Sequence, residues 1–124
     1  MLIIPTLLLS GCALQSRRKS EWIGSYKRQV FIACVTSSNL KLVENDISLS
    51  INFDVIGNTI LAEGASRLGQ SYDKLIQPSK ISDFEEERPI MNYCLMYYEG
   101  KALDSIAKSE YKKYLKSLNF YPEQ

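Results

Sequence analysis

The chain has 124 residues, 45% of them hydrophobic, and a formal net charge of +1 at pH 7. This length suits one domain with a modest core. The near-neutral charge argues against a nucleic-acid partner, because phosphate binding needs clustered positive charge. The sequence has no histidine, which excludes Ser-His and Cys-His nucleophile pairs and histidine metal sites. Its six glycines are scattered and form no phosphate-binding loop. We therefore expect neither an enzyme nor a bound cofactor.

An apolar run at the start of the chain ends in Leu9-Ser10-Gly11-Cys12, the spacing of a bacterial lipoprotein cleavage site. We predict a signal peptide over residues 1–11, lipidation of Cys12 and a mature protein outside the cytoplasm. The run is about half of the ~20 apolar residues that a membrane-spanning helix requires. An ordinary buried N-terminal element is the alternative, since no Lys or Arg precedes Arg17.

Residues 12–19 are predicted to be a basic tether, because Arg17, Arg18 and Lys19 follow the anchoring cysteine closely. In extended conformation, residues 13–20 reach about 25 Å at ~3.3 Å per residue. The basic residues then stay near lipid head groups, where each contributes about 1 kcal/mol of attraction to an anionic surface. A plain solubilising tether fits the same residues.

With Cys12 lipidated, Cys34 and Cys94 are the two cysteines that remain. An even pair in an exported protein is typical of a disulfide. The bond closes a loop of about 60 residues, which gives roughly 4 kcal/mol of stabilisation by chain entropy. Two buried free thiols are the alternative.

Residues 20–124 are predicted to form a compact, all-α helical bundle. Trp22, Tyr26 and Val30 recur at fourfold spacing in a helix over residues 20–35, with Ser20 as its N-cap. Residues 46–67 show both strand-like and helical periodicity. Their length favours one helix capped by Asp46, in which Gly57 costs about 1 kcal/mol relative to alanine and is tolerable where another helix packs closely.

The remaining elements are shorter. We predict a short helix over residues 72–77, ended by Pro78, and a loop over residues 79–89. Pro89 opens a helix over residues 90–98 that Gly100 ends. The last helix places its apolar residues on one face. They are Leu103, Ile106, Ala107, Tyr111 and Leu115.

Two features point to protein binding. The loop carries Asp83 and Glu85–Glu87, whose carboxylates can in principle supply an acid/base pair. Consecutive loop residues do not define two facing carboxyl groups, however, and a solvated charged surface is the simpler interpretation. Tyr93, Tyr97 and Tyr98 flank Cys94. We expect these tyrosines either to contribute to a protein interface or to pack in the core around the disulfide. Because catalytic residues are missing, we expect this protein to bind another protein.

The chain resembles the type VI secretion amidase immunity proteins of the fourth class over most of residues 29–115. The likeness lies in Phe31-Ile32-Ala33-Cys34, in residues 46–68 and in Tyr72-Asp73. It is strongest over residues 89–98 and 103–107, where Cys94-Leu95 and Tyr98 match a Cys-Leu-x-x-Tyr pattern followed by Leu-Asp.

The resemblance implies an all-helical periplasmic protein that neutralises a secreted peptidoglycan amidase by placing a surface loop over its substrate cleft. It implies that the family cysteines correspond to Cys34 and Cys94, and that a homodimer forms. The lipoprotein motif departs from relatives that carry an ordinary secretory signal. Ala13 stands where inner-membrane lipoproteins have Asp, so we expect a lipid-anchored periplasmic protein on the outer membrane.

The candidate inhibitory residues lie in the 79–89 loop. Asp83, Glu85, Glu86 and Glu87 are expected to meet a basic rim on the partner, where charges steer association and specificity. Phe84 either enters the cleft or anchors the loop to the core. The competing function is a membrane-anchored structural or accessory lipoprotein of an envelope complex, and inhibition of a lysozyme is a further binding option.

Overall fold

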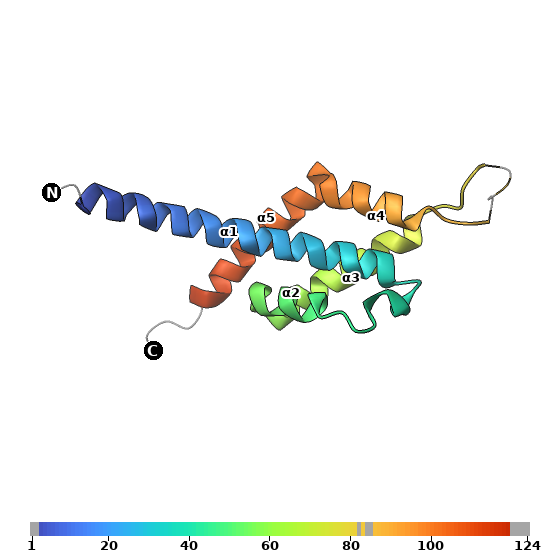
Figure 1. Ribbon diagram of the computed structural model, residues 1–124, viewed down its shortest axis with the longest axis horizontal. Coiled ribbons are helices and arrows are strands. Elements are labelled where there is room, and N and C mark those ends of the chain that lie inside the picture. The colour runs from blue at the N-terminus through green and yellow to red at the C-terminus, as the bar shows by residue number, and fades with distance from the viewer. Residues whose placement is uncertain (1–2, 82, 84–85, 120–124) are drawn as a thin grey trace.

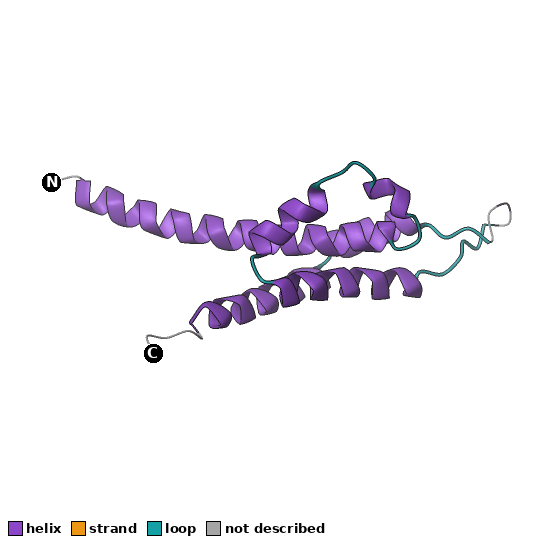
Figure 2. Cartoon of the chain, turned by 90° about the horizontal axis from the view of Figure 1, so that it is seen from below, coloured by secondary structure: helices purple, strands orange, loops and turns teal. Residues whose placement is uncertain are grey.

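The structure is a computed structural model that describes residues 3–81, 83 and 86–119. Within these residues the chain is all-α, with no strand, which confirms the predicted fold class (Figures 1 and 2). The elements are α1 (Ile3–Thr36), the 3₁₀ helix η1 (Leu40–Val43), α2 (Ser48–Ile56), α3 (Thr59–Leu75), α4 (Ile90–Glu99) and α5 (Lys101–Asn119).

Helix α1 is the central element, and its C-terminal half contacts each of the other four α-helices (Figure 1). It begins at Ile3, so the predicted start at Ser20 is wrong for the full chain. Pro5 is compatible with this helix because the N–H groups of a first turn have no intrahelical partner. As a helix, residues 13–20 span only about 12 Å at ~1.5 Å per residue.

The described helices include none that combines the length and the apolar character needed to cross a membrane. The lipidation of Cys12 and the signal peptide over residues 1–11 stay predictions.

The main core forms along one face of α1, where Trp22, Tyr26 and Val30, which recur at fourfold spacing, are buried. The Trp22 indole stacks on Tyr26 and Tyr114, with ring centroids 5.6 and 5.4 Å apart, and donates a 2.8 Å hydrogen bond to the Ile56 carbonyl. The pKa of the Tyr26 phenol is raised, mainly by burial and to a smaller extent by the nearby Glu110 carboxylate. This aromatic cluster joins α1, the end of α2 and α5.

Residues 46–67 are helical, but not as one helix. Gly57 has a left-handed backbone (φ 66°) and ends α2, with its N–H bonded to the Phe53 carbonyl at 2.9 Å. Asn58 then caps α3 by accepting a 3.0 Å hydrogen bond from the Leu61 N–H. Gly57 therefore separates two helices, because glycine adopts this conformation without steric cost.

Other predicted boundaries also shift. The N-cap residue of α2 is Ile47 and not Asp46. Asp46 instead accepts a 2.7 Å hydrogen bond from the Ser48 N–H. Hydrogen bonds from Ser48 lower the pKa of the Asp46 carboxyl group. The separate helix at residues 72–77 is wrong, since residues 72–75 are the last turn of α3. Pro89 is the N-cap of α4, and Gly100 ends α4 as predicted.

Helix α3 packs on α1 through a face of small residues, namely Ala62, Ala65 and Gly69. Gly69 marks the closest approach of the two backbones. A Cβ atom at this position would overlap the Val30 carbonyl and lie 2.8 Å from both the Ala33 Cβ and the Cys34 nitrogen. Only glycine permits the helices to approach this closely.

We predict that Gly69→Ala destabilises the protein by about 1–3 kcal/mol, because the added methyl group forces α3 away from α1. Gly64→Ala is the matched control in the same helix, since its Cβ would meet nothing nearer than an Arg67 nitrogen at 4.0 Å. The control should gain up to about 1 kcal/mol from helix propensity. Urea unfolding of both variants measures the difference, and equal stabilities would contradict this packing.

Candidate functional site

The segment between α3 and α4 projects beyond the ends of both helices, as Figures 1 and 2 show. Its two sides are joined near the base by a 2.7 Å hydrogen bond from the Ser79 N–H to the Glu87 carbonyl. The Ile81 N–H donates to the Ser79 hydroxyl at 3.1 Å. We call residues 77–89 the projecting loop. Its position confirms the predicted loop between these helices.

The predicted contact residues divide into two groups. Asp83, Glu86 and Glu87 are exposed on the projecting loop. Phe84 and Glu85 lie outside the described residues. The described carboxylates of the loop are thus open to solvent, which suits contact with a basic partner surface.

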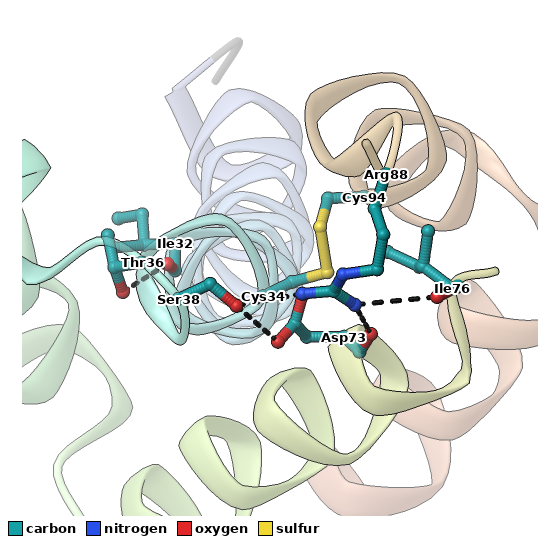
Figure 3. Close-up of a disulfide and its surroundings, with 8 residues drawn as sticks. All are labelled: Ile32, Cys34, Thr36, Ser38, Asp73, Ile76, Arg88 and Cys94. Carbon is teal, nitrogen blue, oxygen red and sulfur yellow. Dashed lines mark hydrogen bonds and ion pairs between the residues drawn. A yellow bond between two sulfur atoms is a disulfide. The ribbon is translucent and has the colours of Figure 1, made fainter. Parts of the chain in front are cut away.

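The base of the projecting loop is held by Arg88, which the sequence analysis did not identify (Figure 3). Its Nη2 donates to the Asp73 carboxylate at 3.1 Å and to the Ser38 hydroxyl at 2.8 Å. Its Nη1 donates to the Asp73 carbonyl at 2.6 Å and, more weakly, to the Ile76 carbonyl at 3.4 Å. Arg88 therefore caps the C-terminal end of α3, where a cation also complements the helix dipole.

Asp73 completes this cluster from the last turn of α3. Asp73 is only 3% exposed, and its second carboxylate oxygen accepts a 3.0 Å hydrogen bond from the Ser38 hydroxyl. A buried carboxylate is tolerated only when it is paired and hydrogen-bonded. Ser38, Asp73 and Arg88, which we call the Arg88 cluster, thus connect the end of α1, the end of α3 and the loop.

Next to this cluster, the Cys34–Cys94 disulfide joins α1 to α4 with the two Cα atoms 5.9 Å apart, which confirms the predicted pairing (Figure 3). Both cysteines are buried together with Val35 and Ile76. The Arg88 cluster and the disulfide lie at the same end of the bundle, so both sides of the projecting loop start from fixed positions.

The tyrosines around Cys94 have different environments. Tyr97 stacks on Tyr72 with centroids 4.1 Å apart, and burial raises the pKa of its phenol. Tyr98 packs edge-on against Phe31, and the Lys27 ammonium lies 5.3 Å from its ring centroid. Tyr97 and Tyr98 therefore serve packing, whereas Tyr93 is exposed.

Helix α4 also presents an apolar, exposed face beside the projecting loop. Met91 and Met96 are 52% and 60% exposed, and Leu95 is exposed with them. The sequence pattern does not indicate this face, because all three residues belong to a nearly continuous apolar segment. Unbranched methionine side chains adapt to irregular partner surfaces.

These features offer binding contacts of two kinds, exposed carboxylates and exposed apolar side chains.

Among the residues that the structure describes, no group of three His, Cys, Asp or Glu side chains is arranged to hold a metal ion. No family model, curated protein or solved structure matches the chain. The resemblance to amidase immunity proteins therefore stays a prediction from the sequence.

We predict that Arg88→Ala destabilises the protein by about 1.5–3 kcal/mol, the range for losing hydrogen bonds to a charged group. The buried Asp73 carboxylate loses its cation, and the end of α3 loses its cap. Lys108→Ala is the control, since it removes an exposed ion pair with Asp104 and should cost less than about 0.5 kcal/mol. Urea unfolding distinguishes the two, and a similar small loss in both would contradict a structural role for Arg88.

We further predict that the double variant Cys34→Ser/Cys94→Ser melts well below the parent protein. The disulfide spans 60 residues, for which loop closure contributes roughly 4 kcal/mol. Reduction of the parent protein should lower its melting temperature to a similar extent. Identical melting of the oxidised parent and the variant would contradict a stabilising disulfide.

Proposed function

We propose that the chain is a lipid-anchored periplasmic immunity protein, tethered through Cys12, that binds a type VI secreted peptidoglycan amidase and covers its substrate cleft. The observation that carries this proposal is the acidic loop that projects from a fixed base. The family resemblance over residues 29–115 supplies the identity of the partner. The all-α fold and the disulfide agree with that resemblance.

A loop on a fixed base suits occlusion for an energetic reason. Each residue that must be ordered on binding weakens the complex, so anchoring the two ends of the loop beforehand reduces this cost. Arg88 holds one side of the loop to α3, and the Ser79–Glu87 hydrogen bond joins the two sides. In the proposed complex, Asp83, Glu86 and Glu87 meet basic residues around the cleft, and Phe84 is the apolar side chain that enters it.

The apolar face of α4 supports binding to a protein. Met91, Leu95 and Met96 lie immediately after the projecting loop in the chain and remain exposed. Apolar contact beside a charged rim is the usual composition of a protein interface. We assign this face to the same partner as the loop.

The test mixes the protein with a panel of type VI amidases that includes any amidase encoded beside it, and measures both binding and residual peptidoglycan cleavage. We expect a stable complex and loss of cleavage. Glu86→Lys/Glu87→Lys should lower the association rate at low salt at least about tenfold, since charges at the rim of an interface steer encounter. Phe84→Ala should weaken inhibition through faster dissociation.

The matched control is Glu44→Lys/Glu63→Lys, which makes the same change in net charge at exposed positions outside the loop. Its association rate should stay near that of the parent. Binding that leaves cleavage intact would contradict occlusion. No binding across the panel would favour the structural or accessory lipoprotein, and turnover of peptidoglycan by the protein itself would contradict a purely binding role.

A further inference from the structure

The end of the bundle opposite the projecting loop has the reverse electrostatic character. It is formed by the N-terminal half of α1 and the C-terminal half of α5, which both point away from the loop (Figures 1 and 2). Basic side chains concentrate on these two segments. They are Arg17, Arg18, Lys19, Lys112, Lys113 and Lys116, against the acidic Glu21 and Glu110.

Most of these basic groups are not neutralised. Lys113 pairs with Glu110 at 3.1 Å. Among the described residues, no ion pair forms at Arg17, Arg18, Lys19, Lys112 or Lys116. All five are exposed, so the described residues at this end carry a net positive charge. The projecting loop, with Asp83, Glu86 and Glu87, carries the opposite charge at the far end.

A groove of about 590 Å³ lies between α1 and α5 at this basic end. Helix α1 contributes Arg18, Lys19 and the acidic Glu21 to its lining. The other lining residues that bear on binding are Val55 of α2 and Tyr111, Tyr114, Leu115 and Leu118 of α5. Leu118 is 56% exposed and Leu115 is 40% exposed. The groove thus combines exposed aliphatic side chains, two tyrosines, two cations and one carboxylate in one surface.

We propose that this basic end, including the groove, binds the anionic phospholipid surface of a membrane. Lys and Arg side chains interact with phosphate head groups while aliphatic and tyrosine side chains enter the interfacial region. Arg18, Lys19 and Lys112 contact the phosphates, and Leu115 and Leu118 contact the upper acyl chains. A nucleic acid would use the cations alone and leave the aliphatic side chains unexplained.

Membrane contact at this end sets the orientation of the whole protein. Arg18 follows Cys12 by six residues on α1, a rise of about 9 Å at ~1.5 Å per residue. In this proposal, a lipid on Cys12 and the Arg18 cation therefore meet the same membrane surface. The projecting loop at the opposite end then faces away from the membrane, toward its partner. Only the tether at Cys12 rests on the proposed function; the surface itself does not.

The test uses the full chain with Cys12→Ser, so that no lipid is attached, and measures co-sedimentation with vesicles. Neutral phosphatidylcholine vesicles report any binding through the apolar N-terminal residues. Vesicles that contain phosphatidylglycerol should bind more protein, and salt should weaken this excess. In Arg18→Glu/Lys19→Glu, the preference for phosphatidylglycerol should fall at least about 25-fold, because each basic residue contributes about fivefold.

Two matched controls isolate the basic end. Lys41→Glu/Lys80→Glu makes the same change in net charge at exposed positions away from the groove and should keep the preference within about threefold. Leu118→Ser should weaken vesicle binding, whereas Leu75→Ser, at a leucine that is 70% exposed at the end of α3, should not. Equal losses in both charge variants, or no preference for phosphatidylglycerol in the parent, would overturn the proposal. Failure to bind an amidase would leave these vesicle results unchanged.

Discussion

The close approach of α3 to α1 at Gly69 determines the geometry of the rest of the molecule. Ala62, Ala65, Gly69 and Asp73 lie on one face of α3, so a contact that brings Gly69 against the α1 backbone also brings Asp73 toward the end of α1. There Asp73 meets Ser38 and Arg88. Tyr72, in the same turn, packs on Tyr97 of α4. A larger side chain at Gly69 would therefore disturb both the core and the base of the projecting loop.

The loop end and the basic end of the bundle have complementary roles in the proposed function. The disulfide and the Arg88 cluster use covalent and charged hydrogen-bonded contacts to fix the base of an acidic, exposed loop. The opposite end combines exposed cations with exposed leucines around a groove. A molecule with this charge separation is suited to contact an anionic surface at one end and a basic protein at the other. Helix α1 connects the two ends, because it carries Cys12 near its start and Cys34 near its end.

Much of the fold could be predicted because it depends on local patterns. Fourfold spacing identified the helix that carries Trp22, Tyr26 and Val30, and assigning Cys12 to the predicted lipid left Cys34 and Cys94 as the pair. The division at Gly57 was missed because periodicity continues through it, whereas the chain direction changes at one left-handed residue. Arg88 was missed for a different reason. Its partners are 15 and 50 residues away in sequence, and no local pattern indicates such contacts. The acidic loop itself was predictable from Pro78, Pro89 and its charges.

The most direct test is hydrogen exchange of the protein, free and bound to an amidase from the panel that it is found to bind. The account predicts slower exchange on binding that concentrates in residues 77–99, which include the projecting loop and the apolar face of α4. The amides of α3 near Gly69 should exchange slowly in both states, because close packing on α1 already protects them. Protection that falls on η1 and α2, with the projecting loop unchanged, would contradict the loop as the inhibitory element.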